Sequence, residues 1–173
     1  MGYKQLVIVL SPVIGALLLW SILALALGIS HPFYIVEGRS MEPTLHDGDL
    51  VVVRKADVKD VKIGDIIVFY EPKTRSKIII HRVIGRVEVR GQVFLRTKGD
   101  NNSKPDPWLV SDEDLIGVVV GGSRPFRLPF VGKAILFLRS PIGLFLLTAL
   151  YVFFIYEVFK KEGGAGRGEG VRG

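Results

Sequence analysis

The chain has 173 residues, 49% of them hydrophobic, and a formal net charge of +6 at pH 7. It has no cysteine, which excludes disulfide bonds, thiolate-ligated metal sites and cysteine nucleophiles. The hydrophobic residues concentrate at the two ends and the charged residues in the middle. Membrane topology and anionic lipid explain this basic balance better than nucleic acid does, so we expect no nucleic-acid partner.

The first segment is apolar enough to cross a bilayer. Residues 5–30 contain no charged side chain, and about 20 apolar residues suffice for a transmembrane helix. The alternative is a cleaved signal peptide, since Ala24-Leu25-Ala26 has the small-x-small form of a cleavage site. The apolar run is much longer than a signal h-region of about 7–15 residues, which favours a retained N-terminal anchor over residues 1–30.

A second apolar run lies near the C-terminus. Residues 140–156 are uncharged, and residues 144–155 are apolar all round rather than on one face, as a buried amphipathic helix would be. We expect a C-terminal transmembrane helix over residues 134–160, with the buried helix as the alternative. The Gly-rich, charged residues 161–173 are expected to form a disordered cytoplasmic tail.

Charge indicates the orientation. Lys4 precedes the first segment, and Lys160, Lys161, Arg167 and Arg172 follow the second. The positive-inside rule then places both termini in the cytoplasm and residues 31–133 outside the cell membrane. Four basic residues on the outer side count against this orientation: Arg124, Arg127, Lys133 and Arg139.

The middle of the chain has the pattern of a β domain. Short β-branched runs bounded by Gly, Asp, Pro or Lys occur at residues 50–53, 66–70, 78–83, 93–97 and 115–120. No amphipathic helical stretch of useful length separates them, which predicts antiparallel sheets that close or fold over to protect their edges. We therefore expect residues 31–133 to form an all-β domain.

Ser40 is a candidate nucleophile. It follows the first anchor by about ten residues, which holds it within about 40 Å of the bilayer even in a fully extended chain. Gly38 and Pro43 bracket it in a turn of restricted geometry. A serine hydroxyl needs a base to accept its proton. Alone, this pattern is typical of an ordinary loop serine.

His81 is the strongest candidate base. It interrupts the run 78–84, which should be a largely buried strand, whereas His31 lies at the membrane exit and His46 lies in a solvated turn. A carboxylate is needed to hold the imidazole in the right tautomer. The Gly/Asn/Pro-rich loop 99–107 offers Asp100 and Asp106, although aspartates in such loops usually serve turn chemistry.

The ordered motifs resemble those of type I signal peptidases. They are Gly38-Arg39-Ser40-Met41-Glu42-Pro43-Thr44-Leu45, Gly48-Asp49, Gly64-Asp65-Ile66, His81-Arg82-Val83 and Lys98-Gly99-Asp100-Asn101-Asn102. The Ser-Met-x-Pro-Thr-Leu segment is highly specific for that family. Because His81 stands where the bacterial branch has a lysine, the chain is similar to the archaeal and endoplasmic-reticulum branch, which uses Ser, His and Asp.

The resemblance implies a fold, a site and an activity. The fold is an all-β catalytic domain with Greek-key-type sheets, flanked by N- and C-terminal transmembrane helices. The implied catalytic residues are Ser40, His81 and Asp106, with Asp100 as a supporting carboxylate. One departure is Gly38, where many bacterial members have a serine that donates to the oxyanion hole; that donor is left unidentified.

The implied substrate is a preprotein cut after small residues in an Ala-x-Ala pattern, through an acyl-enzyme. We expect the substrate to add as a strand beside Ile35, Val36, Gly38, Ile79 and Ile80. The expected partners are signal-peptide-bearing preproteins and the lipid bilayer, with translocation machinery or other subunits left open; no metal or cofactor is expected. Two alternatives remain: a membrane-anchored β module without activity, and a self-cleaving or regulatory Ser-Lys protease using Lys77 or Lys98.

Overall fold

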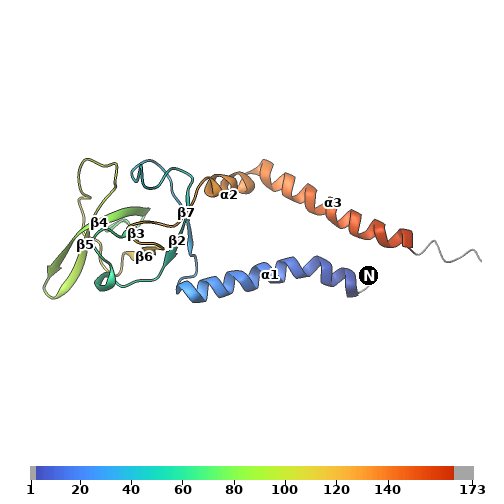
Figure 1. Cartoon of the computed structure of the whole chain (residues 1–173), viewed down its shortest axis with the longest axis horizontal. Coiled ribbons are helices and arrows are strands. Elements are labelled where there is room, and N and C mark those ends of the chain that lie inside the picture. The colour runs from blue at the N-terminus through green and yellow to red at the C-terminus, as the bar shows by residue number, and fades with distance from the viewer. Residues whose placement is uncertain (1–2, 166–173) are drawn as a thin grey trace, which may run out of the picture. The chain divides into compact units, whose positions relative to one another are not determined.

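The computed structural model describes residues 3–165 and divides the chain into two compact units. Residues 22–133 form the β domain, and the second unit consists of the described residues of the two chain ends, up to Ser21 and from Ala134. The β domain carries every strand of the described chain, and long helices occupy the two ends (Figure 1).

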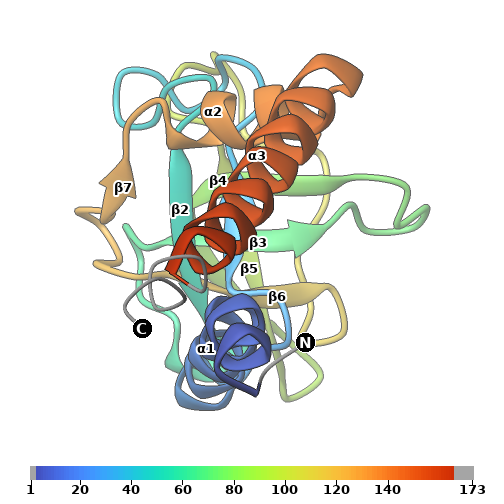
Figure 2. The same ribbon diagram turned by 90° about the vertical axis from the view of Figure 1, so that its right-hand side faces the viewer.

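Seven antiparallel strands build the β domain, with one short 3₁₀ helix between them, η1 (Val58–Asp60). Six strands follow the spatial order β1-β2-β6-β3-β4-β5. Strand β7 pairs with β2 and lies beside it in Figure 2. Their bounds are β1 (Phe33–Ile35), β2 (Leu50–Arg54), β3 (Ile66–Tyr70), β4 (Ile78–Val89), β5 (Gln92–Lys98), β6 (Leu115–Val119) and β7 (Arg127–Leu128).

The sheet is buried on both faces at its centre. Side chains alternate between faces along a strand, and in β3 Ile66 and Val68 belong to one core while Ile67 and Phe69 belong to the other. All four are fully buried. This is why residues 66–70 read as a continuous apolar run rather than as an alternating one.

All five predicted strands correspond to observed strands, and the expectation of an antiparallel β domain is confirmed. Strand β4 is longer than predicted because it continues to Val89 and turns directly into β5. Arg90 and Gly91 form that two-residue connection with φ of 53° and 78°, the left-handed conformation that tight hairpins require. The prediction missed β1 and β7, which have only three and two residues.

Two helices are long and apolar enough to cross a membrane by length and composition. They are α1 (Tyr3–Leu27), with a mean hydropathy of 2.6 over Leu6–Leu27, and α3 (Pro141–Ala165), with 2.1 over Pro141–Lys160. At about 1.5 Å per residue, each stretch covers roughly 30 Å, the thickness of a bilayer's hydrocarbon core. Almost none of either stretch is buried within the protein.

The boundaries at the C-terminal end differ from the prediction of one helix over residues 134–160. A separate helix, α2 (Val131–Arg139), comes first. Ser140 then caps α3 by accepting a hydrogen bond from the Gly143 N–H at 3.2 Å, and Pro141 occupies the first helical position, where its missing N–H costs nothing. The helix continues to Ala165, so the tail predicted from residue 161 does not begin there, and its residues 166–173 lie outside the described part.

Candidate active site

Ser40 lies in a turn, residues 38–45, that connects β1 to β2 and that we call the serine turn. Met41 and Leu45 are buried in the core, at 1% and 0% exposure, and the Leu45 N–H donates to the Met41 carbonyl. Ser40 itself is only partly buried. Two apolar anchors on one side of the turn therefore hold the serine at the surface of the domain.

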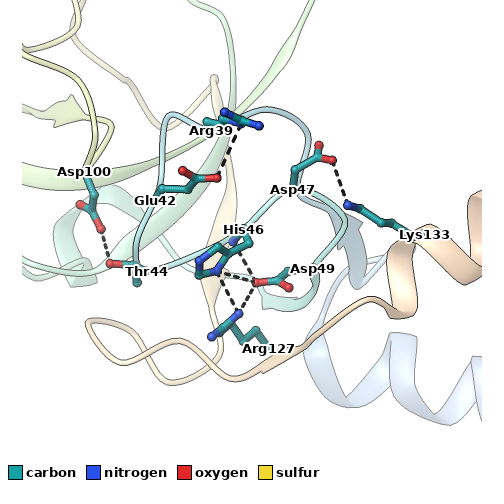
Figure 3. A network of polar contacts seen from close by, with 9 residues as sticks. All are labelled: Arg39, Glu42, Thr44, His46, Asp47, Asp49, Asp100, Arg127 and Lys133. Carbon is teal, nitrogen blue, oxygen red and sulfur yellow. Dashed lines mark hydrogen bonds and ion pairs between the residues drawn. The ribbon is translucent and has the colours of Figure 1, made fainter.

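Polar contacts connect the start of the serine turn to the residues that follow the turn. The Gly38 N–H donates to Asp47 Oδ1 at 3.0 Å. Lys133 lies 3.6 Å from the other oxygen of Asp47 (Figure 3). The hydrogen bond from Gly38 is the main reason why the pKa of Asp47 is lowered. Gly38 adopts a φ of 84°, a backbone conformation that favours glycine.

A second group of polar contacts supports the residues after the turn. Asp49 is 3% exposed and accepts a hydrogen bond from Arg127 at 2.7 Å, while its carboxylate also accepts the His46 backbone N–H (Figure 3). The side chain of His46 is 50% exposed. Its place beside Asp49 and Arg127, away from Ser40, agrees with the solvated turn expected from the sequence.

His81 projects from β4 into the site. It pairs with Ile67 of β3, so its side chain lies on the face of the sheet that carries Ile67 and Phe69. It is 7% exposed and contacts the Phe69 ring edge-on, with 6.4 Å between ring centroids. His81 Nε2 lies 3.2 Å from Ser40 Oγ, which is hydrogen-bonding distance.

Asp106 completes a chain of three side chains. One of its oxygens, Oδ2, lies 2.7 Å from His81 Nδ1 and accepts a hydrogen bond from the Thr97 hydroxyl at 2.6 Å. Its backbone N–H donates to the Thr97 carbonyl, which ties loop 99–106 back to β5. The carboxylate is therefore held from two sides and points at the imidazole.

Asp100 makes different contacts. Arg82 donates to both of its oxygens at 2.7 Å, and the Thr44 hydroxyl donates to it at 2.6 Å. Burial alone would raise the pKa of Asp100, but the hydrogen bonds from Arg82 and Thr44 and the Arg82 charge hold it below its ordinary value. Arg82 also donates to the Gly64 and Ser123 carbonyls. Asp100 thus joins the serine turn to β4 and does not hydrogen-bond to His81.

Ser40, His81 and Asp106 have the geometry of a hydroxyl, a base and an orienting carboxylate. With a proton on His81 Nδ1 donated to Asp106, Nε2 is free to accept the Ser40 proton. Within residues 3–165, the imidazole is the hydrogen-bond partner of the Ser40 hydroxyl. The arrangement can therefore generate an alkoxide nucleophile without a lysine.

A cavity of about 880 Å³ opens beside these three residues. Four of the five residues predicted to bind substrate line it, namely Ile35, Val36, Ile79 and Ile80. Gly38 is not among the lining residues, and its N–H is directed to Asp47. The two sides of the cavity come from the end of β1 and the start of β4.

Four residues of the site were not expected from the sequence. Thr97 holds Asp106, Arg82 holds Asp100, and Asn102 and Trp108 line the cavity. Trp108 packs against a core, as its exposure and its neighbours show. A signal for Arg82 was available, because a charged residue inside a strand that is expected to be largely buried requires a partner.

Comparison with known proteins identifies relatives across most of the chain. The sequence model of the family described as signal peptidase, peptidase S26, matches residues 6–95. The chain is similar to the signal peptidase complex catalytic subunit SEC11 of Candida tropicalis, with 32% identity over 152 residues that cover 79% of this chain and 87% of the relative. It is also similar to human SEC11C, with 32% identity over 157 residues covering 86% and 78%.

These matches extend well beyond the motifs on which the resemblance was first drawn. The family match includes Ser40 and His81, and the two relatives are aligned over 79% and 86% of this chain. The resemblance inferred from the sequence is thereby confirmed. The chain belongs to the peptidase S26 family of signal peptidases.

Proposed function

We propose that this protein is a membrane-bound serine endopeptidase that removes signal peptides from exported preproteins. One observation carries the proposal: in a member of this family, Asp106, His81 and Ser40 stand in a continuous chain of contacts at 2.7 and 3.2 Å. The relatives are named as catalytic subunits of a signal peptidase complex. The roles of individual residues in this chain are our assignment.

Ser40 is assigned as the nucleophile and His81 as general base and then general acid. Ser40 Oγ attacks the carbonyl carbon of the scissile bond while its proton passes to His81 Nε2. The imidazolium, stabilised by Asp106, then protonates the leaving amine, and an acyl-enzyme remains on Ser40. A water molecule, deprotonated by His81, releases the new C-terminus and returns the serine.

The substrate is proposed to bind as an added strand between β1 and β4. Strand β1 has β2 as its neighbour on one side, and β4 pairs with β3 over Ile78–Arg82 while its pairing with β5 begins at Arg82. The outer edge of β4 before His81 therefore offers backbone groups beside the cavity. Main-chain hydrogen bonds along such edges give affinity with little demand on sequence.

The side chains of the cavity support a preference for small residues at the cleavage site. Its wall beside His81 is formed by the β-branched and partly buried Ile79 and Ile80 and by the buried Met41. Such a wall would leave only shallow apolar space on either side of an added strand. We therefore propose cleavage after the Ala-x-Ala pattern.

We propose that α1 and α3 span the membrane, with both termini in the cytoplasm and the β domain outside. Their lengths and hydropathies support two spans, and the basic residues after α3 support this orientation. Anchoring would hold enzyme and signal helix in one two-dimensional phase and so raise their effective concentration. The relatives' names also suggest partner subunits, which the native size of the solubilised protein would reveal.

The test uses the full chain purified in detergent and a preprotein with an Ala-x-Ala site. Wild type is expected to release the signal peptide at that site, read by mass spectrometry, while Ser40→Ala is folded and inactive. Activity that survives Ser40→Ala would refute a serine mechanism, and wild type that leaves the preprotein intact would refute the activity. A His81→Ala variant that keeps activity, beside an inactive Lys77→Ala or Lys98→Ala variant, would favour a Ser-Lys mechanism instead.

A further inference from the structure

The loop that carries Asp100 also holds the backbone of the nucleophile in place. The Asn101 N–H donates to the Ser40 carbonyl at 2.8 Å, and the Asn101 side-chain Nδ2 donates to the Arg39 carbonyl at 3.1 Å. Asn101 therefore bonds to the peptide groups on both sides of Ser40. The next residue of this loop, Asn102, is therefore held at a fixed position relative to Ser40.

The next residue, Asn102, is placed beside the reacting groups by the absence of a side chain on Gly99. A Cβ on Gly99 would lie 2.6 Å from the Ser40 carbonyl oxygen, 2.8 Å from Asn102 Nδ2 and 2.9 Å from His81 Nε2. All three atoms thus border the same small space. The Asn102 N–H donates to the Gly99 carbonyl at 3.0 Å, which closes the turn and sets the direction of the side chain.

The amide of Asn102 has donor capacity to spare. Asn102 lines the cavity, and its side chain makes no hydrogen bond within residues 3–165. Apart from Ser40 itself, the other small polar side chain of the cavity wall, Ser76, is already bonded to Glu71. Partly buried amides normally have partners, so an amide left open next to Ser40 and His81 fits a group whose partner arrives with the substrate.

The reaction needs such a donor. Negative charge develops on the carbonyl oxygen of the scissile bond, and serine hydrolases stabilise it with preorganised hydrogen-bond donors, which are backbone N–H groups or polar side chains. The Ser40 N–H is one candidate: its peptide group is held at the Arg39 carbonyl by Asn101, and within residues 3–165 this N–H has no hydrogen-bond partner. Because N–H and C=O point to opposite sides of a trans peptide, this N–H faces away from Asn101.

The residue two positions before Ser40 does not supply the second donor. Gly38 has no side chain, and its N–H is committed to Asp47 at 3.0 Å. Asn102 supplies what is missing, because a neutral amide can donate without competing with His81 for the serine proton. An amide also keeps this donor at every pH at which the imidazole is neutral, since it does not titrate.

We propose that Asn102 is a further catalytic residue, whose side-chain Nδ2 donates a hydrogen bond to the scissile carbonyl oxygen as it becomes an oxyanion. The inference rests on the proposed function and specifies the same site. It assigns to Asn101 a separate, positioning role, which is to hold the peptide of the first donor and the loop of the second.

The experiment compares wild type, Asn102→Ala, Asn102→Asp and Ser103→Ala on a preprotein, with kcat and KM measured separately. Removing an oxyanion donor lowers kcat by about 10²–10³-fold, and we expect that loss in Asn102→Ala with KM within about threefold and an unchanged melting midpoint. Asn102→Asp keeps the shape but places a carboxylate near the oxyanion, so its kcat should be no higher. Ser103→Ala, an exposed neighbour, should match wild type.

Each outcome decides the inference. A kcat within threefold of wild type in Asn102→Ala, or a raised KM with unchanged kcat, would overturn it, since the amide would then be dispensable or would bind only the ground state. If Asn102→Ala melts at a lower temperature, Asn102→Asp gives the same comparison in a side chain of equal size. Wild type without turnover would count against the proposed function itself, whereas an active wild type with fully active Asn102 variants would count against this residue alone.

Discussion

Replacing the two aspartates of loop 99–106 one at a time should lower kcat mainly in one variant and stability mainly in the other. Asp106→Asn removes the charge that faces His81 Nδ1 at 2.7 Å, and Asp100→Asn removes the charge that faces Arg82. Both changes keep the size of the side chain. The two variants therefore differ in which neighbour loses its partner.

The loss in Asp106→Asn follows from the charge on the imidazole in the transition state. An ion pair with charges about 4 Å apart is worth about 4 kcal/mol at an effective dielectric constant of 20, and each 1.36 kcal/mol is a factor of ten in rate. This gives a fall in kcat of about 10³-fold. If the amide NH₂ turns toward His81, the wrong tautomer is favoured and the loss approaches about 10⁴-fold.

The loss in Asp100→Asn should appear in stability instead. Asp100 and Arg82 are 15% and 22% exposed, and Asp100 accepts hydrogen bonds from Arg82 and Thr44. Weakening hydrogen bonds to a charged group costs roughly 1.5–3 kcal/mol. Since Asp100 makes no hydrogen bond to His81, we expect kcat to fall by less than about tenfold.

The assay measures kcat on the preprotein and, in parallel, unfolding of the β domain in detergent by urea, followed through tryptophan fluorescence, to which Trp108 of the β domain and Trp20 of α1 both contribute. Asp106→Asn should be slow, with a loss of stability no larger than that of Asp100→Asn, and Asp100→Asn should be less stable than wild type and still fast. The reverse pattern, or equal loss of kcat in both variants, would refute the assignment of Asp106 as the orienting carboxylate.

Three further expectations follow from the same contacts. Gly99→Ala should lower kcat by at least about 10²-fold, because its Cβ would displace Ser40 and His81. The matched glycine control is Gly117→Ala, where the Cβ would meet the Arg54 carbonyl. In this control, stability should fall while the folded fraction keeps its kcat. Thr97→Val should cost about 1.5–3 kcal/mol of stability and lower kcat by about tenfold or less, since Asp106 loses one of its two hydrogen-bond donors. A fall in kcat as large as that of Asp106→Asn would contradict this expectation. The pKa of Asp100 is lowered in the folded protein, so ionised Asp100 stabilises the fold above the unfolded pKa of 3.8, and this stabilisation is lost as the pH falls through the lower, folded pKa. The unfolding free energy should therefore drop more steeply from pH 4 to pH 2 in wild type than in Asp100→Asn. Parallel slopes would show that the ion pair does not contribute.

The strands could be predicted because their signals are local. Runs of β-branched residues bounded by turn residues fall on β2 to β6. Strands β1 and β7 have no such signal, since a pairing of two or three residues is decided by the neighbouring strand, here β2 for both. The break at Ser140 was available in the sequence, because serine followed by proline is a typical helix start, but the continuous hydropathy on both sides concealed it.

The candidate site could be predicted only as a set of residues. Ser40 and His81 are 41 positions apart and His81 and Asp106 are 25 apart, so no local rule brings them together. The contribution of Asn102 depends on the absence of a side chain at Gly99, because a Cβ there would lie 2.8 Å from Asn102 Nδ2. Such a dependence between two loop residues and a strand residue is a property of packing, which periodicity does not encode.

One question that the sequence analysis left open, namely which aspartate faces the histidine, is decided by strand alternation. His81 and Arg82 are consecutive in β4, so their side chains lie on opposite faces of the sheet. Val83 pairs with Thr97, and Arg82 pairs with Lys98, so the face of His81 continues through Thr97 and the face of Arg82 continues through Lys98.

The two aspartates follow those two faces. Asp106 returns to β5 through its backbone bond to the Thr97 carbonyl and meets the imidazole, whereas Asp100, two residues beyond Lys98, meets the guanidinium. Inserting one residue between His81 and Val83 would move the imidazole to the face of Asp100. An inserted variant that kept its kcat would show that the alternation of β4 does not select the carboxylate.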